Sequence, residues 1–145
     1  MKIRRPILLS IAAAAAFLST AANAVQLTVM KSPYCGCCAK WIEHVQQHGF
    51  TVKVVDTEDM ASVKKRLGVP DRLASCHTTM AGGYFIEGHV PAADIKRLLA
   101  QKPKATGIAV PGMPAGSPGM EAAGKEPYAT VLVRADGTTG IFARH

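Results

Sequence analysis

The sequence has few aromatic residues and no long apolar stretch beyond its first 24 residues, and each shortage excludes a class of protein. Aromatic residues make up 6% of the chain and are not interleaved with the basic residues, so we do not expect nucleic acid binding. The only run of positive charge is Lys64-Lys65-Arg66, which we interpret as a solvated helix face. After residue 24 no segment approaches the roughly 20 apolar residues that a membrane-spanning helix needs.

The first 24 residues have the pattern of a cleaved signal peptide. Three basic residues precede an apolar stretch from Ile7 to Leu18, and Ala22-Asn23-Ala24 supplies small residues where a signal peptidase reads the chain. Without this segment the formal charge falls from +7 to +4, and residues 25–145 suffice for one domain. We therefore expect an exported protein. The signal resembles those of bacteria, which predicts that the mature protein is located in the periplasm, where disulfides persist.

The spacing of apolar residues and the positions of Gly and Pro predict alternating strands and helices. We expect strands over residues 26–31, 50–55 and 78–86, and helices from the cysteines to Gly49, from Met60 to Leu67 and from Pro91 onward. Residues 102–127 are dense in Gly, Pro and Ala and predict a loop without regular structure. Residues 128–142 predict a β-hairpin, because Asp136-Gly137 between two β-rich runs favours a type I′ turn.

Four cysteines are the most informative residues. Cys35, Cys37 and Cys38 lie within four residues at the expected start of the first helix, and Cys76 is followed directly by His77. Three thiols so close together cannot all pair with one another. With Cys76 they can form either two disulfides or a sulfur-rich metal site, and thiolates are soft ligands that select Cu(I), zinc or iron-sulfur clusters.

Cys35 and Cys38 have the C-x-x-C spacing of thioredoxin-like oxidoreductases, in which the first sulfur lies at a helix N-terminus that favours the thiolate. The order of the elements fits the same fold, a mixed α/β sheet with flanking helices. We expect parallel strands joined by crossover helices to bring the loops that carry the cysteines to one edge of this sheet. Two features of the sequence differ from those of an ordinary thiol-disulfide oxidoreductase. Cys37 adds a thiol that would compete in disulfide exchange, and Cys76-His77 occupies the loop in which such folds carry a cis-proline. Both departures favour a joint metal site of these five residues.

Several longer stretches carry a family resemblance. They are Lys-Ser-Pro-Tyr-Cys-Gly-Cys-Cys at 31–38, Leu-Gly-Val-Pro at 67–70, Ser-Cys-His-Thr at 75–78, the stretch from Gly82 to Pro91, and the Gly/Pro/Met stretch 107–121. Together they resemble the CopG-type family of small periplasmic copper-resistance proteins, long described as a domain of unknown function. The resemblance covers residues 27–142. It implies a thioredoxin-like fold that binds copper, with Cys35, Cys37, Cys38, Cys76 and His77 at the matching positions.

The charge of four thiolates favours several bridged Cu(I) ions over a single monovalent ion. A single structural zinc is the competing interpretation, since Cys₃His and Cys₄ zinc sites are common, although one crowded cluster plus a remote cysteine is not the usual paired spacing. Weaker candidate ligands are Met113 and Met120, which flank a loop that cannot bury them in a regular element, and His89, for which a plain turn is an equal alternative.

Three classes of function follow from these residues. The first is a copper-binding protein of copper resistance, whose partner would be a periplasmic copper donor or acceptor. Redox turnover of copper at the same site would make this protein an enzyme. The second is a thiol-disulfide oxidoreductase that uses Cys35 and Cys38, with Cys76 as the resolving thiol. The third is a partner-binding module that uses the Gly/Pro loop as its contact.

Overall fold

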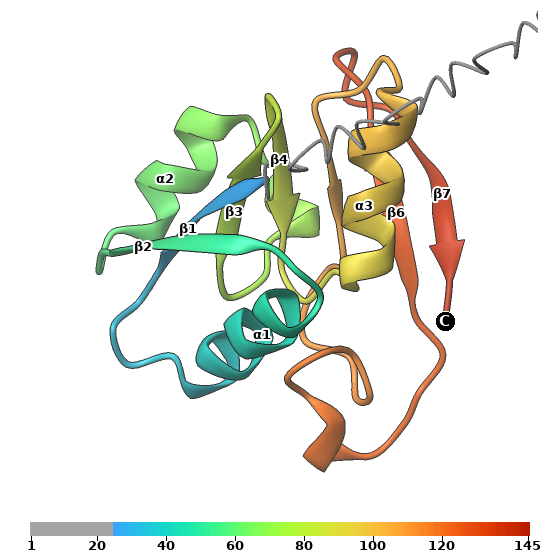
Figure 1. The fold of residues 1–145 in the computed structure, drawn as a ribbon. Helices are drawn as coiled ribbons and strands as arrows, with labels where there is room; N and C mark the ends of the chain where they lie inside the picture. The colour runs from blue at the N-terminus through green and yellow to red at the C-terminus, as the bar shows by residue number, and fades with distance from the viewer. Residues whose placement is uncertain (1–24) are drawn as a thin grey trace, which may run out of the picture.

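The computed structural model describes residues 25–145, and the expected signal peptide lies outside them. Seven strands form one mixed sheet in the order β2-β1-β3-β4-β5-β6-β7 (Figure 1). The strands are β1 Gln26–Lys31, β2 Thr51–Asp56, β3 Thr78–Ala81, β4 Tyr84–Glu87, β5 Gly107–Ala109, β6 Ala129–Val133 and β7 Thr139–Arg144. The helices are α1 Gly36–Gln47, α2 Met60–Leu67 and α3 Ala92–Gln101, with short 3₁₀ turns η1 Asp71–Leu73 and η2 Glu121–Ala123. The predicted α/β class with a mixed sheet and flanking helices is confirmed.

Apolar residues cover both faces of the sheet. On one face α1 and α3 pack against the sheet through residues at helical spacing, and Trp41, Val45, Ile95 and Leu98 are fully buried there. On the other face a smaller group gathers around Phe85 and includes side chains from the segment that follows α2. The sheet is therefore the middle layer, and the helix that follows the first three cysteines is held firmly by its apolar face.

The region predicted as a single third strand over residues 78–86 is a hairpin instead. β3 pairs antiparallel with β1 and with β4, and Gly82 and Gly83 form the turn with φ of 55° and 87°. Glycine adopts such positive φ values without steric cost. The Gly-Gly pair therefore ends one strand and starts another, and the third strand runs opposite to the first.

Two further predictions need correction. The segment 102–127 was expected to lack regular structure, but it contains β5, which pairs parallel with β4, and η2. At the C-terminal hairpin, β6 and β7 pair as predicted, but the turn is not type I′. Gly137 alone has a positive φ there, and its N–H donates to the Arg134 carbonyl, so the turn follows the type I pattern with a left-handed glycine.

Candidate metal centre

Strand directions bring four separate segments to one edge of the sheet. β1 ends at Lys31, four residues before Cys35. β3 runs antiparallel to β1 with Met30 opposite Thr78, so the loop before β3, which carries Cys76, lies beside the end of β1. Thr78 also pairs with Glu87 at the end of β4, which places His89 at the same edge. β5 is parallel to β4 and leads from the same edge into the loop with Met113.

The sulfur atoms of all four cysteines gather at this edge, within 4.8 Å of one another. Cys35 and Cys38 are joined in a disulfide, while Cys37 and Cys76 are free thiols. The Cys37 sulfur lies 3.5 Å from that of Cys35 and 3.7 Å from that of Cys76. Two sulfurs that share one tetrahedral ion at about 2.3 Å each would lie roughly 3.8 Å apart. The spacing of Cys37 and Cys76 therefore fits a shared soft metal ion.

Helix α1 presents the first three thiols in different directions. Cys35 is its N-cap residue and has no side-chain hydrogen bond to the first turn, so a Cys35 thiolate would face the unpaired amides of the helix. Cys38 is fully buried, whereas Cys37 is partly exposed, because consecutive helix residues point about 100° apart. Cys37 is thus the member of the three that faces both Cys76 and the surface.

His89 is fully buried and oriented by a backbone carbonyl. Its Nδ1 lies 2.8 Å from the Pro118 oxygen and its Nε2 lies 3.1 Å from the Cys76 sulfur. A carbonyl only accepts hydrogen bonds, so Nδ1 carries the proton and Nε2 presents its lone pair to the sulfur. Burial lowers the pKa of His89, which favours the neutral ring. A ligating histidine is commonly held in this way through its other nitrogen.

His77 is fully buried, and neither of its ring nitrogens has a hydrogen-bond partner in the described structure. Its ring lies 4.4 Å from that of Trp41 and 5.1 Å from that of His89, between centroids. Burial first, and then the nearby charges of His89, Lys64 and Lys31, hold its pKa well below the ordinary value. An unsatisfied buried polar group costs about 1–3 kcal/mol. Two ring nitrogens without hydrogen-bond partners, grouped with Cys76 and His89, are the pattern expected of a residue that binds a metal ion.

The Cys76 thiol holds its proton in the metal-free protein. Burial first, and then the charge of Cys37 and a hydrogen bond with it, raise the pKa of Cys76 to about 11. A metal ion binds the thiolate, so its arrival must displace this proton. The donor set is thus two to four sulfurs with one or two neutral imidazoles, which suits a soft ion.

A buried ion pair supports the loop that carries Cys76 and His77. The Glu87 carboxylate has no exposed surface, and the Lys64 ammonium, whose side chain is 13% exposed, lies 2.5 Å from it. The same carboxylate accepts hydrogen bonds from the Ser75 amide at 2.6 Å and from the Thr78 hydroxyl at 2.6 Å. Burial raises the pKa of Glu87, and Lys64 and the hydrogen bonds oppose that rise. The loop is therefore clamped on both sides of Cys76-His77.

The Gly/Pro-rich loop between β5 and β6, drawn in orange in Figure 1, contacts the first turn of α1 through Gly119, which lies close to the Cys37 carbonyl oxygen. Met113 is 52% exposed and its sulfur is 3.9 Å from that of Cys37. Met120 lies further along and lines a hollow of about 550 Å³ together with Cys37 and Lys40. Of the two methionines, Met113 is the one in contact with the sulfur cluster.

Gly119 fixes the approach of this loop to α1. Its φ is +87°, and a Cβ there would lie 2.8 Å from the Cys37 carbonyl oxygen and 3.0 Å from the Trp41 nitrogen, both backbone atoms. We expect Gly119→Ala to lower the free energy of unfolding by about 1–3 kcal/mol, because a left-handed alanine is strained and the backbone contact leaves no room. Urea unfolding measures the change. Gly36→Ala, where nothing lies within 4 Å of the added Cβ, is the control and should change stability far less, and an equal loss in both variants would contradict this role.

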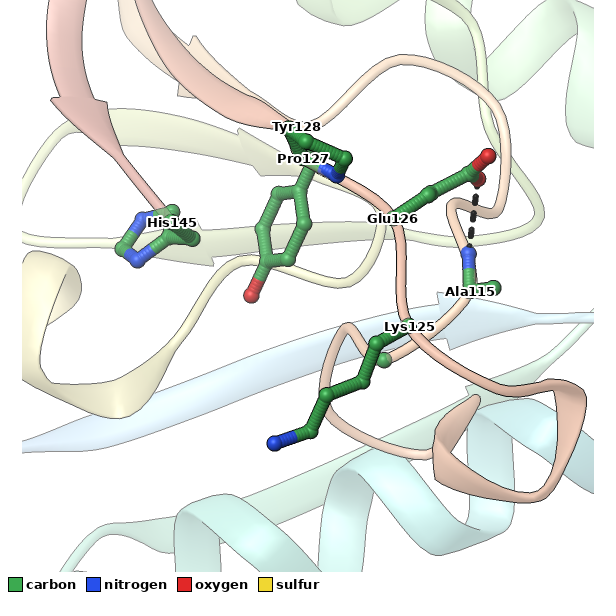
Figure 2. Close-up of a pocket in the computed structure, with 7 residues that line it drawn as sticks. Ala115, Lys125, Glu126, Pro127, Tyr128 and His145 are labelled. Carbon is green, nitrogen blue, oxygen red and sulfur yellow. Dashed lines mark hydrogen bonds between the residues drawn. The ribbon is translucent and has the colours of Figure 1, made fainter.

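A second cavity of about 390 Å³ lies beyond the same loop. Figure 2 shows its lining residues, with the Glu126 carboxylate accepting a hydrogen bond from the Ala115 amide at 2.8 Å. His145 also lines it and pairs with the buried Asp94 carboxylate at 2.9 Å. None of its lining residues is a cysteine or methionine. This cavity therefore offers no sulfur ligand, whereas all four cysteines of the described chain lie at the other site.

Of the five residues that the sequence indicates, the four cysteines form one group, and His77 groups with Cys76 and His89. The sequence did not assign two other residues of this region. The sequence favours a metal ligand and a residue of an ordinary turn equally at His89. It does not reveal that Pro118, 29 residues away, orients the ring. The sequence pattern did not assign Glu87 to the site. A signal for a buried ion pair was present, since an acidic residue at the end of an apolar strand is buried only when it is paired. The partner, Lys64, belongs to a basic run that the sequence favours as a solvated helix face.

Comparisons with known proteins show the family of the chain. A family described as "Protein of unknown function, DUF411" matches residues 73–120, a range that includes Cys76, His77 and His89. No curated protein matches the chain. Two solved structures, "Copper resistance protein copG" in Form 2 and Form 1, match with TM-scores of 0.80 and 0.79, both at 43% identity over 84% of this chain and 98% of theirs. With that identity over nearly the whole length of a solved relative, the chain belongs to the CopG family of copper resistance proteins.

Proposed function

We propose that this protein is an exported copper-binding protein of copper resistance that, when fully reduced, holds several Cu(I) ions through Cys35, Cys37, Cys38, Cys76 and His77. The observation that carries the proposal is the gathering of four cysteine sulfurs within 4.8 Å of one another in a member of a copper-resistance family. Opening the Cys35–Cys38 disulfide makes all four thiols available. In this proposal copper is the substrate that the protein binds and not a resident cofactor, and the chain supplies the soft ligands.

The residues around the site suit Cu(I) better than zinc. Four thiolates carry four negative charges, so several monovalent ions bridged by sulfur balance them, while the soft thiolates favour Cu(I). The neutral rings of His77 and His89 add nitrogen donors without adding charge. Trp41 closes the site on the core side, and its indole nitrogen is already satisfied by the Val90 carbonyl at 2.9 Å.

A thiol-disulfide oxidoreductase remains the second candidate, and a specific observation favours it. Cys35 and Cys38 form a disulfide at the N-terminus of α1, the arrangement from which exchange reactions proceed. Against it stands Cys37, whose sulfur lies 3.5 Å from that of Cys35 and would compete with any substrate thiol for the disulfide. Turnover of dithiol substrates by the metal-free protein would favour this second function.

Location and partners belong to the same proposal. The signal-like first 24 residues and the family membership support the periplasm as the site of action. No helix in residues 25–145 is long and apolar enough to cross a membrane. A periplasmic protein that delivers or receives copper is the expected partner, since Met113 and Cys37 leave the sulfur cluster open to the surface.

Titration of the reduced protein with Cu(I) tests this function. We expect more than one Cu(I) per chain in anaerobic titration against a chromogenic Cu(I) chelator, because four thiolates within 4.8 Å can bridge several ions. Zn(II) bound beforehand should be displaced by Cu(I), and metal analysis after desalting measures both. A single zinc ion that copper fails to displace would contradict the proposal and favour a structural zinc site.

A further inference from the structure

The disulfide divides the four cysteines into two pairs with different chemistry. Cys35 and Cys38 are bonded to each other, and a disulfide sulfur is no longer a thiolate ligand. Cys37 and Cys76 remain free thiols, with their sulfurs 3.7 Å apart. In this state two of the four cysteine ligands are lost, and the free thiols of Cys37 and Cys76 are the sulfurs from which a smaller site can form.

The sulfurs of the two free thiols are the middle members of a continuous chain of four ligand atoms. The Met113 sulfur lies 3.9 Å from that of Cys37, which lies 3.7 Å from that of Cys76. The Cys76 sulfur lies 3.1 Å from Nε2 of His89, the ring nitrogen that carries the lone pair. Two thiolates, a thioether and an imidazole nitrogen are the ligand types that bind copper, and the thioether in particular favours Cu(I) over zinc.

The segments that carry these atoms are held by contacts that do not involve the disulfide. Pro118 orients His89, and Glu87 anchors the Ser75 amide beside Cys76. The Ser75 hydroxyl donates to the Gly112 carbonyl, and the Gly112 amide donates to the Ala74 carbonyl at 3.3 Å. The loop with Cys76 and the loop with Met113 are thus tied directly to each other. These contacts hold both loops in place before an ion arrives, which lowers the cost of binding. The Cys76 sulfur groups both with the other cysteine sulfurs and with the His89 ring, so an ion held there by Cys37 and His89 together draws these two side chains closer to each other.

We propose that the disulfide form of this protein binds one Cu(I) between Cys37, Cys76 and His89, with Met113 as an exposed fourth ligand. The proposal rests on the proposed copper function and names a second, smaller site within it. Binding transfers no electrons: the Cys35–Cys38 bond stays intact, the thiol protons pass to solvent, and the ion arrives and remains as Cu(I).

Formation of the Cys35–Cys38 disulfide therefore lowers the number of Cu(I) ions that the protein binds but does not remove all of them. The fully reduced chain has four thiols and holds several ions, whereas the oxidised chain keeps one. Met113, 52% exposed, lies on the open side of this remaining ion. It is the ligand that an incoming thiol of a partner protein would replace first.

The experiment compares three forms of the protein under anaerobic conditions. The forms are the reduced protein, the protein whose Cys35–Cys38 disulfide has been verified by alkylation and mass spectrometry, and the double variant Cys35→Ser/Cys38→Ser. Each is titrated with Cu(I) in competition with a chromogenic Cu(I) chelator. We expect more than one Cu(I) in the reduced protein, one in the disulfide form and one in the double variant. Mass spectrometry after loading should find the disulfide still intact.

Variants within the disulfide form identify the ligands. Cys37→Ser should abolish binding of the single ion, and His89→Gln should weaken it at least tenfold, since the amide offers no comparable nitrogen ligand. Met60→Leu, which changes the methionine at the start of α2, should leave the affinity unchanged. X-ray absorption of the loaded form should show sulfur and nitrogen neighbours around Cu(I). Circular dichroism confirms that each variant is folded.

The outcomes separate this inference from the function on which it rests. No Cu(I) in the disulfide form, beside several in the reduced protein, overturns the second site and leaves the copper function standing. No Cu(I) in the reduced protein overturns both. Unchanged affinity in His89→Gln, or opening of the disulfide during loading, also overturns the inference.

Discussion

Replacing Cys37 by serine is expected to reduce the copper content of the reduced protein by at least one Cu(I) per chain. The Cys37 sulfur lies within 4 Å of the sulfurs of Cys35, Cys76 and Met113, so it has the central place in the cluster. A serine hydroxyl is a hard ligand that does not replace a bridging thiolate toward Cu(I). The loss should therefore exceed that of a peripheral ligand.

The fold should survive this change, because Cys37 is partly exposed and is absent from both apolar clusters of the core. Ala39→Ser is the matched control. It places the same hydroxyl on an exposed position of α1, away from the sulfurs, and should bind copper like the unchanged protein. Anaerobic Cu(I) titration and thermal unfolding measure the two properties separately.

The same variant separates the two candidate functions. An exchanger needs only Cys35 and Cys38, so removal of the competing thiol at Cys37 would leave disulfide reductase activity intact or raise it. A copper site loses a shared ligand. If copper stoichiometry and affinity stay unchanged in Cys37→Ser while reductase activity persists, the copper assignment is wrong and the oxidoreductase takes its place.

The parts of the fold that local sequence determines were predictable. β1 over Gln26–Lys31 and α2 over Met60–Leu67 have the predicted bounds, because alternation in one and helical spacing between clear stop signals in the other leave little choice. β5 was missed, since its three residues, Gly107–Ala109, are too short to show a period and become a strand only by pairing with β4 and β6. Tertiary pairing, which a single sequence does not display, decides such short strands.

The four cysteines lie together as predicted, with His77 grouped with Cys76, but the reason for the prediction was partly wrong. We expected parallel strands to bring the loops to one edge, but β3 is antiparallel to β1. Cys76 reaches the same edge because the start of an antiparallel strand lies beside the end of its neighbour. The thioredoxin-like assignment stays a prediction. His89 and Glu87 were beyond reach because their roles depend on Pro118 and Lys64, whose distance in sequence conceals their contact.

The second large effect is expected at Glu87, which touches no candidate ligand. We expect Glu87→Gln to lower the free energy of unfolding of the metal-free protein by about 3–5 kcal/mol, the usual cost of removing one partner from a buried ion pair. The glutamine has nearly the same shape, but it leaves the Lys64 ammonium, 13% exposed, without a counter-charge. Urea unfolding followed by circular dichroism measures the loss.

A double-mutant cycle shows whether the unpaired charge is the cause. Lys64→Met removes the ammonium and keeps an apolar side chain of similar length, so the double variant Glu87→Gln/Lys64→Met should be more stable than Glu87→Gln alone. Glu126→Gln, at a largely exposed carboxylate that accepts one backbone hydrogen bond, should cost far less. If Glu87→Gln and Glu126→Gln lose equal stability, or if Lys64→Met gives no recovery, the buried pair does not hold the loop. The clamp would then have to come from the hydrogen bonds of Ser75 and Thr78, which glutamine can largely preserve.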